Sequence, residues 1–255
     1  MTETSPWSRL KTLTRARIGL GRAGDGLPTR ALLEFQIAHA KARDAVHGAV
    51  DWESLKLALA PLETISISSA APDKSVYLRR PDLGRVLAPS EAEKLVAGPF
   101  DIVFVIGDGL SAAACEAYAA KAARAARALL ADFSVAPVVL ARGARVALSD
   151  PIGAAMRAQL VVMLIGERPG LSAADSLGCY LTFAPRPGRR DSERNCISNI
   201  HAHGLVPERA AQKIAWLARE ALRLKLTGVE LKESAPDDRF PAGAIVERID
   251  VTHGV

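Results

Sequence analysis

The sequence predicts an α/β fold: a Rossmann-like, mostly parallel sheet flanked by helices, with a small helical N-terminal domain or arm in front of it. Two uninterrupted apolar runs, at 102–106 and 160–165, are typical of strands buried on both faces. An alanine-rich stretch at 112–131 has high helix propensity and lies between them. Strands that alternate with helices in this way build a parallel sheet covered by helices on both faces.

The N-terminal part of the chain predicts two helices. The first is expected to begin at Thr29, because Leu32, Phe35 and later apolar residues recur at helical spacing opposite charged residues. This pattern is typical of a helix that docks on a partner. His39 lies on the apolar stripe, where a packed side chain is more common than a ligand. The second helix is expected over 52–59.

The remaining elements follow from alternation, turns and apolar runs. Residues 64–69 alternate between apolar and polar and so predict a half-exposed strand. After a turn at Pro72-Asp73 the chain is expected to return as a strand through 76–78. Further along we expect strands at 135–140 and 179–183, and helices at 152–158 and 208–226.

These elements divide the chain into three parts. Residues 1–62 are expected to form an N-terminal arm and helical docking region, and residues 63–231 the Rossmann-like domain. Residues 232–255 form a C-terminal extension without a regular pattern, in which 244–251 is a candidate strand.

Composition excludes several classes of protein. The 255 residues are 49% apolar and 24% charged, which is an ordinary globular composition rather than a disordered one. Aromatic residues make up only 5%, which argues against a surface that stacks bases, and we expect no nucleic-acid partner. The net charge of +5 suggests an anionic partner. The densest basic cluster is either a solvated loop or a contact for phosphate or an acidic protein, and it comprises Arg186, Arg189, Arg190 and Arg194.

The cysteines and the N-terminus indicate where the protein works. Cys115, Cys179 and Cys196 form no CxxC pair, which is typical of a reducing compartment and provides no zinc-ligand spacing. The first residues lack the apolar core of a signal peptide, and no stretch has the length of a membrane span. We therefore expect a cytoplasmic protein with no membrane partner.

One stretch, 160–201, is expected to organise the binding site. Glu167 and Arg168 follow directly after its buried strand, at the carboxyl edge where open α/β sheets bind ligands. A basic loop at 186–194 and the stretch 196–201 come next in the chain. We expect three polar loops to converge on this edge and to bind a large polar ligand.

A glycine turn offers an alternative function. The Gly107-Asp108-Gly109 turn lies between a predicted strand and a predicted helix, which is typical of phosphate binding. A self-sufficient nucleotide-binding α/β enzyme is therefore an alternative. Against it, no acidic residue closes the next strand, where a ribose-binding carboxylate belongs.

The sequence offers weaker support for a catalytic nucleophile or a metal site. Cys196 has His201 and His203 downstream, but this separation guarantees no contact, and a buried structural cysteine is the simpler interpretation. Residues 199–204 match only in part a motif in which a histidine ligates the cobalt of cobalamin. We therefore assign neither a nucleophile nor a metal ligand.

Five segments together carry a family resemblance, and they occur in this order: ARIGLGRAGDGLPTRALLEFQIAHAKARDAVH, YLRRPDLGR, VIGDGLS, IGERPGLSAADSLGCYLTFAPR and NCISNIH. They resemble the small (light) subunit of ethanolamine ammonia-lyase, and the resemblance runs from about residue 15 to about residue 230. The combination of GERPGL with CISNIH at this spacing is the most specific part of the resemblance.

The resemblance implies a subunit of an adenosylcobalamin enzyme, a carbon–nitrogen lyase that converts ethanolamine to acetaldehyde and ammonia. The partner is then a large subunit that carries the substrate site on a TIM-type barrel, with the cofactor between the two subunits. The implied cofactor contacts of this chain are Val146, Glu167 and Cys196, and no residue here is catalytic. The short stretch before the matching region leaves both the free cytoplasm and a bacterial microcompartment open.

Overall fold

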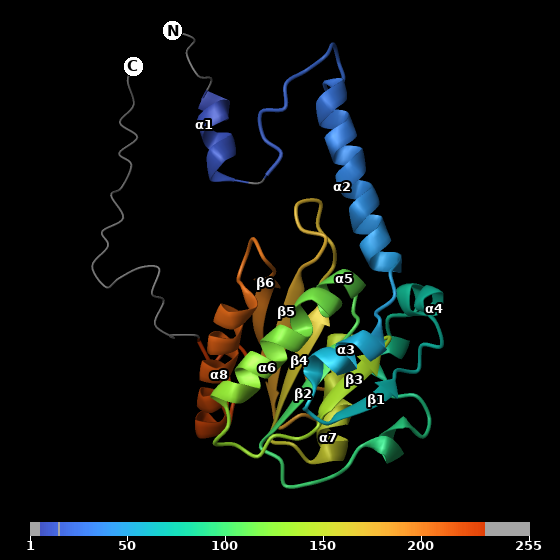
Figure 1. Ribbon diagram of the computed structural model, residues 1–255, viewed down its shortest axis with the longest axis vertical. Coiled ribbons are helices and arrows are strands. Elements are labelled where there is room, and N and C mark those ends of the chain that lie inside the picture. The colour runs from blue at the N-terminus through green and yellow to red at the C-terminus, as the bar shows by residue number, and fades with distance from the viewer. Residues whose placement is uncertain (1–5, 15, 233–255) are drawn as a thin grey trace, which may run out of the picture.

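A six-stranded sheet forms the centre of the computed structural model, which describes residues 6–14 and 16–232. The strand order is β1-β3-β2-β4-β5-β6 (Figure 1). The first four strands in this order are parallel, whereas β4–β5 and β5–β6 are antiparallel pairs, so β6 runs in the direction of β4. This confirms the predicted mostly parallel α/β sheet. The strands are β1 (Thr64–Ser68), β2 (Ile102–Gly107), β3 (Val138–Arg142), β4 (Leu160–Gly166), β5 (Leu177–Phe183) and β6 (Asn195–Ile200).

Helices cover both faces of the sheet, as predicted. One face packs against α3 (Trp52–Leu59), α6 (Ala120–Leu129) and α8 (Pro207–Leu224), and the other against α7 (Ser149–Met156) (Figure 1). Every residue of β2 and β4 is buried, because both strands lie between these two layers. Alanines fill the buried positions of α6 and five of the eight buried positions of α8, so the two helices approach each other and the sheet closely.

The helix expected at 112–131 is present, although it is not uniform. It begins as α5 (Ala112–Ala114), passes through a π-helical turn at Cys115–Ala119 and continues as α6. Ser111 caps its start by accepting the N–H of Ala114 at 3.3 Å. A π-helical turn inside a helix often marks a place where local geometry is adjusted for packing or function.

The N-terminal helices predicted from Thr29 and over 52–59 are both present. They are α2 (Thr29–His47) and α3, and a further helix, α1 (Pro6–Leu13), precedes them. Figure 1 shows α2 projecting from the body of the molecule, and Ala31 is its one buried residue. Asp51 caps α3 by accepting the N–H groups of Glu53 and Ser54, each at 3.1 Å.

Two expected strands differ in the structure. Residues 76–78 belong to α4 (Lys74–Arg79), because the Asp73 carboxylate accepts the N–H of Val76 at 2.9 Å and starts a helix. The strand expected at 135–140 begins at Val138, because Pro137 has no N–H to give to the ladder.

The stretch 196–201, expected as a loop, is for the most part strand β6. It forms the last strand of the sheet beyond β5, with a register shift opposite Leu177 and Cys179. Asn199 has a φ of +63° at this irregularity. The expected strand at 244–251 lies outside the described residues. Short 3₁₀ turns complete the fold at Leu83–Arg85, Glu91–Lys94, Val146–Leu148 and Asp191–Glu193.

Candidate functional site

The carboxyl ends of β2, β3, β4 and β6 lie at one edge of the sheet, because these strands run in the same direction. This is the edge at which open α/β sheets bind ligands. Val146 and Glu167 lie in the segments that leave β3 and β4 there. Cys196 does not, because it lies near the start of β6, opposite Tyr180, which is the middle residue of β5. Of the three loops expected to converge, the one with Glu167 and Arg168 lies at this edge. The basic loop 186–194 follows β5, which is antiparallel to β4, so it leaves the sheet at the opposite edge, and 196–201 is mostly strand β6. The expectation of three converging loops is therefore wrong.

Glu167 is held across the ends of three strands. Its Oε2 accepts the hydroxyl of Ser176 at 2.6 Å and the N–H of Asn199 at 3.3 Å. The carboxylate lies over Gly178, where a Cβ would be 2.9 Å from Oε1. Within residues 6–14 and 16–232, Oε1 accepts no hydrogen bond from another residue. The carboxylate is therefore fixed through one oxygen, and the other oxygen can accept a donor from a ligand.

Cys196 of β6 lies directly opposite Tyr180 of β5, so the two side chains are on the same face of the sheet. Cys196 is exposed and Tyr180 is half-buried, whereas their neighbours Cys179 and Ile197 point to the other face and are buried in the core that includes α8. Although the residue is exposed, partial desolvation of its thiol by the surrounding side chains raises the pKa of Cys196. The nearby Tyr180 hydroxyl lowers this pKa, and the negative charge of Glu167 raises it. The thiol is therefore protonated at neutral pH. It can donate a hydrogen bond, and it is not an activated nucleophile.

Val146 begins the 3₁₀ turn that joins β3 to α7. Its side chain is half-buried against the apolar core on the α7 face of the sheet. Its carbonyl accepts the hydroxyl of Ser149 at 2.8 Å. The preceding Arg145 places its guanidinium 4.3 Å from the centre of the Tyr77 ring. These contacts fix the turn and present Val146 as an apolar surface near the carboxyl edge.

The Gly107-Asp108-Gly109 turn does not form a phosphate site. Asp108 Oδ1 accepts the N–H groups of Gly109 and Ala144, each at 3.0 Å, so two donors that a phosphate would use are occupied. Lys74 donates to the Gly109 carbonyl at 2.9 Å and lies 3.8 Å from the Asp108 carboxylate. Instead of binding an anion, the turn links β2 to the segment that leads to Val146.

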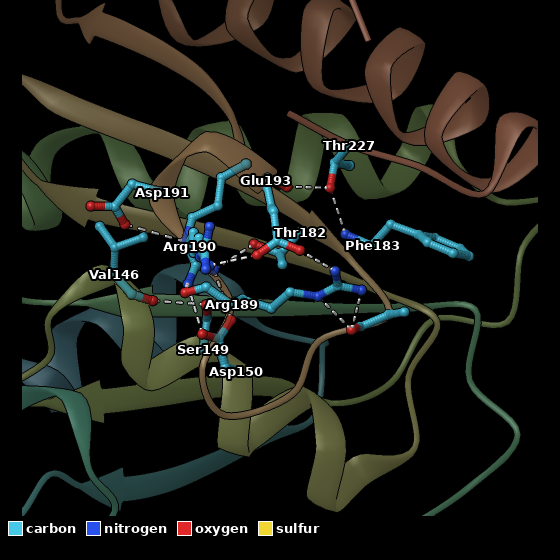
Figure 2. Close-up of polar contacts among 12 residues, drawn as sticks. Val146, Ser149, Asp150, Thr182, Phe183, Arg189, Arg190, Asp191, Glu193 and Thr227 are labelled. Atoms are coloured by element: carbon cyan, nitrogen blue, oxygen red, sulfur yellow. Dashed lines mark hydrogen bonds and ion pairs between the residues drawn. The ribbon is translucent and has the colours of Figure 1, made fainter. Parts of the chain in front are cut away.

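A buried ion pair between Asp150 and Arg194 was not predicted from the sequence. Figure 2 shows Asp150 with the neighbouring Thr182 and Arg189. The two Nη atoms of Arg194 donate to the two carboxylate oxygens of Asp150 at 2.7 and 2.6 Å. One of them also donates to the Thr182 hydroxyl at 2.8 Å, and the other to the Arg189 carbonyl at 3.1 Å. The two paired side chains are 1% and 2% exposed, so Arg194 is not available to an external anion.

The family follows from comparison with known proteins. The family model of the ethanolamine ammonia-lyase light chain (EutC) matches residues 4–232. The chain belongs to this family. It is 53% identical over 240 residues to the ethanolamine ammonia-lyase small subunit of Bradyrhizobium diazoefficiens, a match that covers 91% of this chain and 92% of the relative.

Two further small subunits of ethanolamine ammonia-lyase are similar over nearly the whole chain. The one from Rhodopseudomonas palustris is 52% identical and the match covers 89% of each chain. The one from Xanthomonas campestris pv. campestris is 49% identical and the match covers 92% of this chain and 91% of the relative. Membership of the light-chain family makes the protein a lyase subunit, and it gives no support to a self-sufficient nucleotide-binding enzyme.

The basic loop of this light chain is largely occupied by internal contacts. Arg189 donates to the Ala184 carbonyl at 3.0 and 3.1 Å and pairs with Glu193. With Arg194 buried, Arg186 and Arg190 are the two exposed arginines of the predicted cluster. Neither of the two alternatives for this cluster, a solvated loop or an anion contact, therefore holds for the buried Arg194.

His201 is engaged within its own turn. Its Nδ1 accepts the N–H of His203 at 3.2 Å, so Nε2 carries the proton and lies 2.7 Å from the Asn199 side-chain oxygen. The ring is buried. In the described part of the light chain, no group of three or more His, Cys, Asp or Glu could hold a metal ion. None of its described helices has the length and apolar character needed to span a membrane.

Proposed function

We propose that this chain is the small subunit of an adenosylcobalamin-dependent ethanolamine ammonia-lyase, and that it binds one side of the cofactor where it meets a large subunit. The enzyme converts ethanolamine to acetaldehyde and ammonia. The observation that carries the proposal is the polar surface formed by Glu167, Tyr180 and Cys196 in a member of the light-chain family. The protein acts in the cytoplasm, either free or inside a bacterial microcompartment.

The chemistry of these groups suits the rim of a corrin ring, which carries amide side chains. The Glu167 Oε1 accepts an amide N–H, and the Cys196 thiol donates to an amide carbonyl. Val146 supplies an apolar contact from the β3–α7 turn. When bound, adenosylcobalamin supplies the radical that starts the reaction. This chain binds and orients the cofactor and excludes water, and its residues transfer no proton to the substrate.

The N-terminal arm is the proposed docking region for the large subunit. Among the described residues, eight of the sixteen exposed large apolar side chains lie between Trp7 and Ile37. A helix such as α2 with a single buried residue gains little stability from its own chain and needs a partner surface. Light chains by name accompany a heavier chain, and the exposed faces of α1 and α2 suit that role.

The test is a titration of the assembled enzyme. The light chain is co-expressed with its large subunit, purified through a tag on the light chain, and titrated with adenosylcobalamin by absorbance. Glu167→Gln keeps the shape but removes the charge of the accepting group. A hydrogen bond to a charged group contributes about 1.5–3 kcal/mol, so we expect cofactor Kd to rise roughly 10- to 100-fold.

Glu91→Gln is the matched control. Glu91 also accepts a backbone N–H, from Ser68 at 3.2 Å, and its side chain is 16% exposed. We expect this variant to bind the cofactor as the wild type does. A light chain that does not co-purify with the large subunit, or a wild-type complex that binds no cobalamin and releases no acetaldehyde, would refute the proposed function.

A further inference from the structure

Two of the proposed cofactor contacts are far apart in the sequence and are joined in the fold by one ion pair. Asp150 follows Val146 by four residues, and Arg194 precedes Cys196 by two. Figure 2 shows Asp150 beside Val146 and Ser149, with Thr182 of β5 nearby. The guanidinium and the carboxylate form two parallel hydrogen bonds of 2.7 and 2.6 Å. Such a fork fixes distance and orientation at the same time.

The Asp150 side of the pair is tied to Val146. The 3₁₀ turn Val146–Leu148 runs directly into α7, whose first turn contains Asp150. The hydroxyl of Ser149 donates to the carbonyl of Val146 at 2.8 Å and closes the turn. A displacement of Asp150 is therefore transmitted to Val146 through a short, hydrogen-bonded segment.

The Arg194 side of the pair is tied to β6 and β5. Arg194 directly precedes β6, and its guanidinium also donates to the hydroxyl of Thr182 on β5 at 2.8 Å. Cys196 pairs with Tyr180, two residues before Thr182 on the same strand. The guanidinium thus spans α7, β5 and the start of β6, and its position sets where Cys196 lies relative to Val146.

Stability alone is a weak explanation for this pair. The free energy needed to remove two charges from water is about as large as the free energy gained from their attraction. Apolar residues of similar volume at such positions often stabilise a protein equally well. Packing is already close at the same place, because a Cβ on Gly153 of α7 would lie 2.4 Å from Pro185. What apolar packing does not provide is the directional link between the two segments.

We propose that Arg194 and Asp150 are a positioning pair that sets the spacing between Val146 and Cys196 and so prepares the two segments to bind one face of the cofactor. The inference rests on the proposed function, because it assumes that Val146 and Cys196 contact the corrin ring. It predicts that breaking the fork weakens cofactor binding more than it weakens the fold.

The experiment uses the complex with the large subunit. Arg194→Lys keeps the positive charge and loses the fork, and Arg219→Lys makes the same change in the exposed pair with Asp132, whose hydrogen bonds measure 2.5 and 2.7 Å. For each variant the Kd for adenosylcobalamin is measured by absorbance titration, together with the thermal midpoint and the KM for ethanolamine. We expect Arg194→Lys to raise cofactor Kd at least tenfold at unchanged substrate KM, and Arg219→Lys to change neither.

A second variant keeps the test decisive if the lysine variant does not fold. In Asp150→Leu/Arg194→Met both charges are removed together and apolar volume is retained. A folded double variant that binds cofactor at least tenfold more weakly supports the positioning role, and one that binds like the wild type refutes it. If neither variant yields folded complex, the pair is needed for folding and the proposal fails. If the wild-type complex binds no cobalamin, the proposed function fails instead.

Discussion

Gly109 marks the closest approach between the β2 turn and the end of β4, so an alanine there tests the packing beneath the candidate site. Its φ is +55°, and a Cβ would lie 2.2 Å from the Gly166 carbonyl oxygen and 2.6 Å from Ile165. Left-handed backbone costs an L-residue about 1–2 kcal/mol, and overpacking a rigid region adds ~1–3 kcal/mol. Gly109→Ala is therefore expected to destabilise the light chain by about 2–5 kcal/mol.

Thermal unfolding of the purified light chain, followed by circular dichroism, measures this effect. For a chain of this size, each kcal/mol lowers the midpoint by about 2–4 °C, so we expect a decrease of roughly 4–20 °C. Gly188→Ala is the control, because Gly188 has a φ of +91° and no atom within 4 Å of an added Cβ. It should show the backbone cost alone, about 1–2 kcal/mol.

The reasoning is refuted if the two alanine variants are destabilised by the same amount. The Gly166 carbonyl would then move away from the added Cβ without a loss of stability. Glu167 follows Gly166 directly, so the steric effect also has a functional consequence. In complex with the large subunit, Gly109→Ala should weaken cofactor binding, whereas Gly188→Ala should not.

Two further predictions concern the thiol and the arm. Partial desolvation raises the pKa of the exposed Cys196 thiol above its ordinary value, so the thiol is largely protonated at pH 8. The rate of Cys196 alkylation by iodoacetamide, followed by mass spectrometry, should still increase between pH 8 and 10. A rate that levels off by pH 8 would contradict this. The buried Cys115 and Cys179 serve as controls and should react only after unfolding. In the arm, Leu32→Glu/Phe35→Glu should weaken association with the large subunit at least about tenfold in a co-purification titration. Leu57→Glu, at an exposed apolar residue of α3, should leave association intact, and equal loss in both variants would remove α2 from the interface.

The sequence predicted the elements whose signals are local. The apolar runs of β2 and β4 are continuous because both strands are covered on two faces, and α2 carries an unbroken helical stripe. β6 escaped prediction because the irregularity at Asn199 interrupts its alternation and makes it resemble a loop. The helix α4 was missed because its Asp73 cap was interpreted as part of a turn between strands.

The site was predicted less completely, because its decisive contacts connect distant residues. Arg194 was grouped with neighbouring arginines, and nothing local to it points to Asp150, 44 residues earlier. Asp108 was interpreted as part of a phosphate turn, and only the fold brings Ala144 to its carboxylate. The assignments of Val146, Glu167 and Cys196 to the cofactor came from family resemblance and stay predictions.

The position of β6 at the end of the sheet also bears on solubility. Within residues 6–14 and 16–232, no strand lies beyond it, and an exposed strand edge can recruit a second chain and lead to aggregation. Both ends of this edge are protected. The Asn195 side chain is bonded to Gly228 and Leu231, and the Asn199 carbonyl accepts the N–H of Leu205. The open stretch between them, 196–198, is short, which limits how far this edge can pair with a strand of a second chain.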